Sequence, residues 1–341
     1  MNFSEFQIWR TQSQRENPGA LDCAETNLYR SLAALRPKPS AANTDRKIHR
    51  CDLARAWLNR YEFHADNSRR ALVCQGVRHA LGLIFAEVAS SGAALWLPRD
   101  VYPVYMELAH AAGIKPHLFR TLPQPHFPQH QDTGQAEFLL IANPLKPLGR
   151  FLSEQECAGL KNWLAASPNR QLIVDCVYDL GVPFHPSTRT LAETGQAILL
   201  HSVTKGWLWP KTFGVALIGR GHLQLEITFR NAPPTQEQLA LAEISFSVEV
   251  KLPTKIMSVL NQRKEKLLAA LPSAVIESFV LESSSLAPGC YFFPIKIQTD
   301  LLLHQHQIIG IPASAFGADW NGSILTSLAD NFAVDNEGGQ P

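Results

Sequence analysis

The sequence lacks the features that mark membrane, metal-binding and disulfide-stabilised proteins. No apolar run in its 341 residues reaches the roughly 18 residues that a membrane helix needs. The six cysteines are scattered without a Cys-x-x-Cys pair, which favours reduced thiols over a zinc site or a disulfide framework. The formal net charge of +1 gives no electrostatic reason to expect nucleic acid or an anionic membrane as a partner.

The composition that remains is that of a globular enzyme. Hydrophobic residues make up 45% of the chain and charged residues 18%, which argues against wholesale disorder. Residues 1–7 carry an early acid and no apolar core, so we expect no secretory signal and predict a cytoplasmic protein.

The length suggests two domains or one large α/β unit. We divide the chain into an N-terminal arm (1–50), a large domain (51–250), a small C-terminal domain (251–330) and a flexible tail (331–341). The arm is rich in Asn, Pro and Arg, and we expect it to be irregular.

Short apolar runs alternate with segments of helical periodicity through the large domain. Strands are expected at 71–74, 93–97, 138–142, 172–175, 197–200 and 215–218, and helices at 52–63, 77–88, 104–112 and after a cap at Ser153. Strands that are apolar on both faces and separated by helices predict a mainly parallel sheet covered by helices on both sides. Further strands near 291–297 and 308–311 would belong to a smaller α/β domain.

Polar residues or glycine follow four of these apolar runs. Gly76, Asn143, Asp175 and Ser202 each stand at the carboxyl end of an expected strand. Ligands in parallel sheets bind at that edge, so these residues are predicted to share one pocket.

Two motifs indicate the chemistry of this pocket. Asp175-x-x-Tyr178 closes one strand and Ser202-x-x-Lys205 closes the next. A lysine forms a Schiff base through its neutral amine, and pyridoxal chemistry needs a buried carboxylate to hold the pyridine nitrogen protonated. We therefore predict a pyridoxal 5′-phosphate site with three catalytic residues: Lys205 as the amine, Asp175 as the partner of the ring nitrogen and Tyr178 as a donor to the ring oxygen.

The cofactor phosphate needs backbone donors at a helix N-terminus together with hydroxyls or cations. Gly76, Val77 and Arg78 open an expected helix after a strand, and Ser202 and Thr204 place two hydroxyls within the Ser-x-x-Lys motif. We predict that these five residues bind the phosphate.

Two more residues are predicted to contact the cofactor ring. Asn143 can share the bond to the ring oxygen, and Tyr102 can stack on the pyridine. Each candidate also has an ordinary structural role: Asp175 as a turn cap, Tyr178 as a packing residue, Asn143 as a turn starter before proline and Tyr102 as a loop aromatic.

Over residues 70–330 the chain resembles fold-type I pyridoxal-phosphate enzymes, in particular class I/II aminotransferases and their histidinol-phosphate aminotransferase-like branch. Residues 75–81 are similar to the glycine-led phosphate turn, 97–105 to the Pro-x-Tyr-x-x-Tyr segment, 143–149 to the Asn-Pro-x-x-Pro-x-Gly signature and 310–317 to the loop before the last strand. The resemblance implies the PLP-dependent transferase fold, with a small domain built from the C-terminal part and the N-terminal arm. It also implies a homodimer whose arm reaches the partner.

Two departures from the family pattern bear on binding. The arginine that clamps the cofactor phosphate is missing from 209–214, where Lys211 can supply a point charge, with Arg78 as a second cation. The last strand has Leu325 where the family usually has the arginine that binds the substrate carboxylate. The candidate replacements are Arg30, Arg50, Arg220 and Arg230, each of which is otherwise a solvated surface residue. On this reasoning Leu325→Arg should improve binding of simple α-amino acids.

The family divides among transamination, decarboxylation, cyclisation or elimination, and retro-aldol cleavage. Transamination is the commonest outcome, so we predict an aminotransferase acting on a small amine or amino acid, in specialised metabolism, with atypical recognition of the substrate carboxylate. A lyase, cyclase or decarboxylase of the same fold is the alternative. A non-catalytic binding protein is disfavoured because Lys205 and Asp175 are both retained. His201 is a further acid/base candidate, although strand alternation can turn it away from the cofactor.

Overall fold

A seven-stranded sheet organises the larger part of the protein. The computed structural model describes residues 1–37, 48–63, 69–101, 103–128, 134–209, 213–219 and 223–334. The strand order is β2-β8-β7-β6-β5-β3-β4. The strands are β2 (Arg69–Cys74), β3 (Ala94–Pro98), β4 (His117–Phe119), β5 (Glu137–Ala142), β6 (Arg170–Asp175), β7 (Ala197–Ser202) and β8 (Gly214–Gly219).

The sheet is mainly parallel, as predicted. Strands β4, β3, β5, β6 and β7 pair in parallel, whereas β8 runs antiparallel to both β7 and β2. Strand β2 therefore points the same way as β7. The carboxyl ends of β2, β5, β6 and β7 consequently meet at one edge of the sheet, where the sequence predicts the pocket.

Helices cover both faces of this sheet because its strands are apolar on both sides. One face packs on α4 (Val77–Ser91), α5 (Val104–Ala111) and α9 (Leu223–Asn231). The other face packs on α3 (Arg50–Arg60), α6 (Glu154–Ala165), α7 (Pro186–Ala192) and α10 (Gln236–Ser247). Helix α6 begins with the predicted capping box, in which Ser153 and Glu156 satisfy each other's backbone N–H groups.

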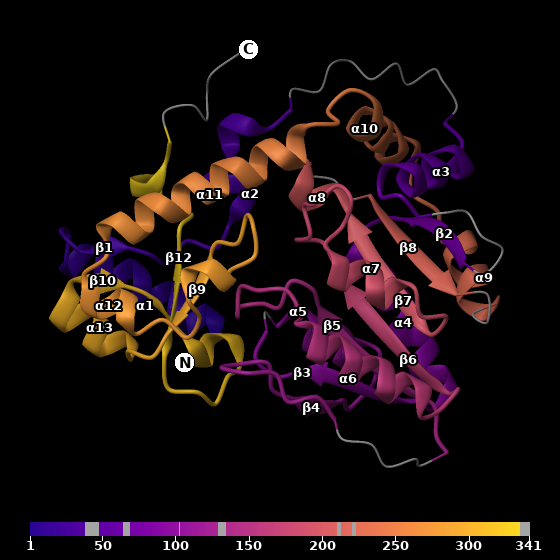
Figure 1. The fold of residues 1–341 in the computed structure, drawn as a ribbon, viewed down its shortest axis with the longest axis horizontal. Coiled ribbons are helices and arrows are strands. Elements are labelled where there is room, and N and C mark those ends of the chain that lie inside the picture. The colour runs from indigo at the N-terminus through magenta and orange to yellow at the C-terminus, as the bar shows by residue number, and fades with distance from the viewer. Residues whose placement is uncertain are drawn as a thin grey trace.

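A second, smaller group of strands lies beside the large sheet. Strands β9 (Phe292–Ile295), β11 (Ile311–Pro312) and β12 (Ser323–Thr326) form an antiparallel sheet, and β1 (Leu21–Asp22) pairs with β10 (Ile308–Ile309). Helices α12 (Ser273–Glu277) and α13 (Thr299–His306) lie with them. Figure 1 shows α11 (Leu252–Ala270) running from the end of the large sheet to this smaller region.

The N-terminal segment is regular rather than irregular, contrary to the sequence-based expectation. Asn2 and Glu5 form a capping box that starts α1 (Phe3–Glu16), and α2 (Leu28–Ser31) follows β1. Phe6 is fully buried, and the ring of Phe3 meets that of Phe316 edge to face. Residues 1–37 therefore pack on the C-terminal region of their own chain. In the expected tail Phe332 is also buried, and 335–341 lie outside the described residues.

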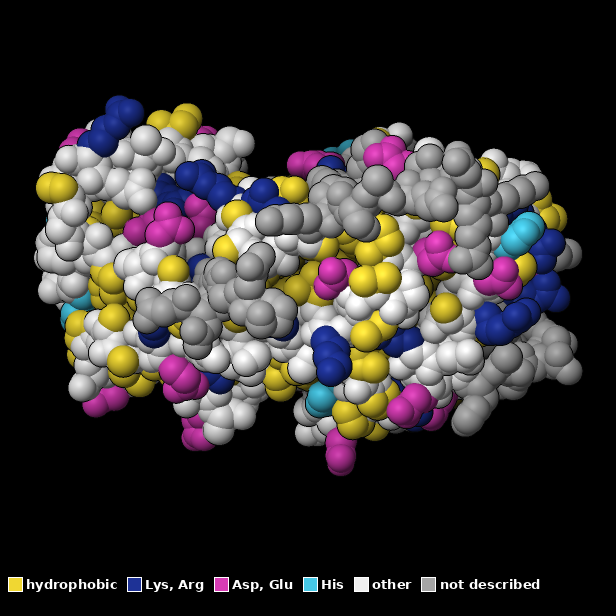
Figure 2. Space-filling view, turned by 90° about the horizontal axis from the view of Figure 1, so that it is seen from above, with side chains coloured by type: hydrophobic (Ala, Val, Ile, Leu, Met, Phe, Trp, Pro, Cys, Tyr) yellow, Lys and Arg dark blue, Asp and Glu magenta, His cyan; other side chains and the backbone are white. Residues whose placement is uncertain are grey.

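The described surface carries charges of both signs. Figure 2 shows one face on which Lys and Arg side chains are interspersed with Asp and Glu, in keeping with the net charge of +1. Within the described ranges, no helix is long and apolar enough to cross a membrane.

Candidate active site

A cavity of about 880 Å³ lies at the carboxyl edge of the large sheet. Its walls come from the ends of β5, β6 and β7, the first turns of α4 and α8 (Val203–Gly206), and the N-terminal segment around residues 25–30. This volume is in the range of pockets that hold small molecules and cofactors. Phe292 of β9 and Phe316 also line it, so segments from the N-terminal and C-terminal parts of the chain enclose one site.

Asp175 is the buried carboxylate of this cavity. It is the last residue of β6 and is only 8% exposed. The hydroxyl of Tyr105 donates to Asp175 Oδ2 at 2.6 Å, and the backbone N–H of Val177 donates to Oδ1 at 3.2 Å. Burial raises the pKa of the Asp175 carboxyl, and the Tyr105 hydrogen bond opposes that rise. The sequence contained Tyr105 in the Pro-x-Tyr-x-x-Tyr segment but gave no sign of its pairing with Asp175.

Lys205 faces the same cavity from the neighbouring strand end. Strand β7 pairs in parallel with β6, and the short helix α8 begins immediately after it. Ser202 caps this helix by accepting from the N–H of Thr204, and both residues line the cavity. The Lys205 amine lies 5.4 Å from the centre of the Tyr178 ring. The structure thus brings together the three residues that were predicted to be catalytic.

Tyr178 and Tyr291 form the floor beside these groups. The hydroxyl of Tyr291 donates to that of Tyr178 at 2.8 Å. The side-chain nitrogen of Lys146 lies over the Tyr178 ring, and Lys146 lines the cavity. Sequence reasoning gave Lys146 no role, because it occupies a variable position of the Asn-Pro-x-x-Pro-x-Gly signature.

Asn143 does not reach the cavity, in contrast to its predicted role at the ring oxygen. Its amide group donates to Ser187 Oγ and Thr188 Oγ1, both at 2.9 Å, and its carbonyl oxygen accepts from Leu152 N at 3.0 Å. Both amide hydrogens are already used, so Asn143 holds the turn together. The residue of this segment that enters the cavity is Lys146.

The start of α4 forms the end of the cavity suited to an anion. Gly76 is the N-cap residue and has φ of 114°, a conformation that favours glycine. Val77 and Arg78 follow it and line the cavity. A Cβ atom on Gly214 of β8 would lie 2.9 Å from the Gly76 Cα, so glycine at 214 lets the turn sit close to the sheet. The predicted contacts of Tyr102 and Lys211 fall on positions outside the described residues.

His201 points away from the cavity, as strand alternation allows. The indole N–H of Trp57 donates to its Nδ1 at 3.1 Å, and the Tyr61 hydroxyl lies 3.4 Å from its Nε2. Burial lowers the pKa of His201 to about 3. This side chain is therefore a neutral core residue on the opposite face of the sheet.

Leu325 also points away from the cavity. It is fully buried, pairs with Phe293 across β12 and β9, and packs in an apolar cluster with Leu302 and Ile308. An arginine at 325 would place a charge in that cluster, which costs several kcal/mol when the charge has no partner. The structure does not support the expectation that Leu325→Arg improves amino-acid binding.

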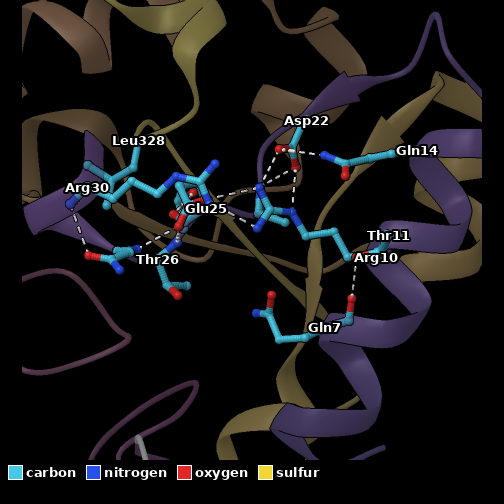
Figure 3. A network of polar contacts seen from close by, with 12 residues as sticks. Gln7, Arg10, Thr11, Gln14, Asp22, Glu25, Thr26, Arg30 and Leu328 are labelled. Atoms are coloured by element: carbon cyan, nitrogen blue, oxygen red, sulfur yellow. Dashed lines mark hydrogen bonds and ion pairs between the residues drawn. The ribbon is translucent and has the colours of Figure 1, made fainter. Parts of the chain in front are cut away.

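Cations of the N-terminal segment enter the cavity instead. Figure 3 shows Arg10 between Asp22 and Glu25, with Arg10 Nη2 2.5 Å from Asp22 Oδ2 and 3.5 Å from Glu25 Oε2. Arg30, which follows on α2, also lines the cavity. Of the other arginines considered, Arg50 donates to the backbone carbonyl of Arg230, and Arg230 pairs with Glu226 on α9. Position 220 lies outside the described residues.

Comparison with known proteins places this chain in a family. The family model of class I and II aminotransferases matches residues 43–218, about half of the chain. The chain belongs to this family. It is therefore a pyridoxal-phosphate-dependent enzyme, and the cofactor predicted from the motifs is confirmed at the level of the family.

Individual relatives are distant. The aspartate aminotransferase of Bacillus subtilis (strain 168) is 22% identical, and the match covers 75% of this chain and 72% of that one. An alanine aminotransferase from Pyrococcus furiosus has a TM-score of 0.68 at 16% identity, covering 96% of this chain and 92% of its own. A C-S lyase from Staphylococcus hominis has a TM-score of 0.64 at 13% identity, covering 92% and 86%. These similarities show a shared fold.

The residues of the cavity fit the family's cofactor. A lysine amine, a buried carboxylate at a strand end, and a helix N-terminus with a neighbouring arginine and hydroxyls face one space. These are the groups that an aldehyde, a protonated pyridine nitrogen and a phosphate require. The donor set thus agrees with pyridoxal 5′-phosphate without any rearrangement of the sheet.

Proposed function

We propose that this aminotransferase acts on an amino compound with an anionic end, which it binds through Arg30 rather than through a residue of the last strand. The observation that supports this most directly is that Arg30 faces the same cavity as Lys205, while Leu325 is buried elsewhere. Arginine is suited to this task because its planar fork pairs with a carboxylate by two hydrogen bonds. The family usually places the carboxylate-binding arginine on the last strand. An arginine at position 30 in its place supports a substrate of specialised metabolism.

We assign the residues of the cavity as follows. Bound pyridoxal phosphate supplies a ring that withdraws electrons from the carbon next to the substrate nitrogen. Asp175 holds a proton at the ring nitrogen, and Tyr178 donates to the ring oxygen. The Lys205 amine carries the cofactor and later moves a proton to and from the substrate carbon.

The phosphate contacts complete this assignment. The backbone N–H groups at Gly76 and Val77 bind the phosphate at the start of α4, together with the hydroxyls of Ser202 and Thr204. Arg78 adds a charge there, because it lines the cavity from the first turn of this helix. Lys211 and Tyr102 stay in the proposal as further contacts from the sequence motifs.

Arg10 and Arg30 differ in whether a carboxylate of the protein already compensates their charge. Arg10 already faces two carboxylates, those of Asp22 and Glu25. Glu25 is itself compensated, because its Oε1 accepts from the backbone N–H groups of Thr26 and Asn27 at 2.9 and 2.8 Å. Arg10 and Glu25 therefore form a closed network that shapes the wall. The Arg30 charge has no carboxylate within ion-pair distance among the described residues, and it is left to a substrate.

We expect Arg30→Ala to raise KM for amino acids about 10- to 100-fold with little change in kcat. A hydrogen bond to a charged group contributes about 1.5–3 kcal/mol, which corresponds to this range. The measurement compares each amino acid with the amine that lacks its carboxylate, and the preference for the acid should shrink in the variant. Arg55→Ala is the control, because Arg55 is exposed on α3 and contacts only Asp52 among the described ion pairs. An unchanged preference in Arg30→Ala contradicts the assignment.

We also propose that the enzyme is a homodimer, as its family resemblance implies. Helix α1 packs within its own chain, and the reach of the arm before residue 50 across to the neighbour rests on the family resemblance. Sedimentation of the active enzyme should give twice the mass of one chain. A fully active monomer at the assay concentration contradicts this part of the proposal.

A further inference from the structure

Four aromatic rings line one wall of the cavity and contact one another in turn. They come from three parts of the chain: the first turn of α1, the end of the short 3-10 helix after β11, and the start of β9. The ring centres of Phe3 and Phe316 lie 6.1 Å apart, and those of Phe316 and Phe292 lie 6.0 Å apart, both edge to face. The rings of Phe292 and Tyr291 lie 4.4 Å apart. We call Phe3, Phe316, Phe292 and Tyr291 the aromatic wall.

Helix α1 presents one face to the cavity. Phe3, Gln7 and Arg10 are four and three residues apart, so they lie along the same side of the helix, and all three line the cavity. Figure 3 shows Gln7 and Arg10 projecting from that side. Ile8 lies on another side and is 71% exposed. The cavity face of α1 therefore changes from aromatic at Phe3 to polar at Arg10 over about 10 Å of helix axis.

The charged side chains that line the cavity stand outside the aromatic wall. Near the sheet edge the described ones are Asp175, Lys146 and Lys205, and α4 adds Arg78. The others belong to the N-terminal segment: the Arg10–Glu25 pair, and Arg30. The wall itself offers ring carbon and a single hydroxyl, that of Tyr291, whose hydrogen is given to Tyr178.

A wall of this composition selects an apolar group. Water is released when an apolar group covers aromatic carbon, and the gain grows with the area covered. A charged group would lose its hydration there without gaining a partner. Edge-to-face contact is also an arrangement that aromatic rings prefer, and Phe3, Phe316 and Phe292 already adopt it. A further ring from a ligand would extend the same packing.

We propose that the substrate is an amino acid with an aryl side chain, and that the aromatic wall binds this side chain. The side chain of an amino acid leaves the carbon that also carries the amino group, so it starts at the reacting end of the cavity. The wall reaches that end, because Tyr291 donates to Tyr178 and the Tyr178 ring centre lies 5.4 Å from the Lys205 amine. This inference rests on the proposed function, since the acid end of the same substrate is assigned to Arg30.

Three acids without an amino group test the side-chain preference by binding alone. Calorimetry with the cofactor-loaded enzyme compares 3-phenylpropionate, which has the aryl group, with propionate, which lacks it, and with succinate, which has a second carboxylate in its place. We expect 3-phenylpropionate to bind at least about 10-fold more tightly than propionate, because even one methylene in an apolar pocket is worth about 10-fold or more. Succinate should bind no more tightly than propionate. Equal affinities for 3-phenylpropionate and propionate, or succinate as the tightest ligand, would overturn the proposal.

Two variants test whether the aromatic wall causes the preference. Phe3→Ala removes a ring from α1, and Phe316→Leu removes a ring while keeping much of the volume of a buried side chain. Each should lower the affinity ratio of 3-phenylpropionate to propionate by about 3- to 10-fold, the size of effect that one aromatic contact has. Ile8→Ala is the matched control on the same helix, because its side chain is exposed and does not line the cavity, and the ratio should stay unchanged.

Folding and turnover separate the remaining outcomes. The denaturation midpoint checks each variant, and if Phe3→Ala unfolds, the ratio in Phe316→Leu decides. A wild-type ratio in the folded variants would place the side chain elsewhere and refute the proposal. Transamination of alanine without any preference for 3-phenylpropionate would remove the aryl subsite and leave the proposed function standing. A preference that both variants reduce, in an enzyme that does not transaminate phenylalanine, would support the subsite and count against the proposed function.

Discussion

Lys205→Ala should lose turnover by at least about 10²- to 10⁴-fold, the contribution of one positioned acid–base group. The loss should be larger if covalent attachment of the cofactor is also required. Loss of the amine removes both the group that carries the cofactor and the group that moves the substrate proton. Steady-state kinetics with an amino donor and a keto acid measure the effect. Lys146→Ala is the matched comparison, since it removes a second amine of the same cavity and should retain measurable turnover.

The fold should survive the Lys205→Ala change. Lys205 lies on the four-residue helix α8, and its neighbours Val203 and Trp207, rather than the amine, pack into the core. Far-UV circular dichroism and the denaturation midpoint should therefore stay close to those of the wild type. Wild-type activity in Lys205→Ala contradicts the assignment, and unfolding would show that the amine is structural.

The second large effect is expected for Asp175→Asn, which should lower kcat about 10²- to 10³-fold. The substitution keeps the shape but removes the charge that holds the ring nitrogen protonated, and single preorganised electrostatic partners are typically worth this much. Asp175 is buried and accepts a hydrogen bond from Tyr105 at 2.6 Å, so solvent has little access to the position where its negative charge acts. The cofactor should still attach at Lys205, which absorbance of the purified variant checks.

Tyr105→Phe provides a graded control for this prediction. It removes the hydrogen bond that opposes the rise in the Asp175 pKa and leaves the carboxylate in place. We expect an intermediate loss of activity and a narrower pH range on the acidic side, because the unsupported carboxylate protonates at higher pH. A near-normal rate in Asp175→Asn would remove this carboxylate from the mechanism.

The fold and much of the site follow from local signals in the sequence. The apolar runs that end in Asp175 and Ser202 predict two strands joined by a helical connection. Strands joined in this way run parallel, so both motifs lie at the same edge of the sheet. The Ser153 capping box likewise marks the start of α6. Asn2 and Glu5 form the same capping pattern at the start of α1. We nevertheless predicted an irregular arm, because residues 1–50 are rich in polar residues and proline.

What the sequence could not give is the direction of individual side chains outside regular elements. In the turn at 143–149, Asn143 binds Ser187 and Thr188 while Lys146 enters the cavity, and only the path of the loop decides between them. The facing of Leu325 depends on the register between β12 and β9. The approach of Arg30 depends on long-range packing of residues 1–37 against the C-terminal region, which no local pattern encodes.

The most direct test of the whole account is borohydride reduction of the cofactor-loaded enzyme, followed by protease digestion and mass spectrometry. Reduction fixes the cofactor to the amine that carries it, and among the residues that the structure describes the cavity is lined by two lysines, Lys205 and Lys146. We predict a pyridoxyl group on the peptide that contains Lys205 and none on the peptide that contains Lys146. Modification of Lys146, or of any lysine outside this cavity, would contradict the assignment.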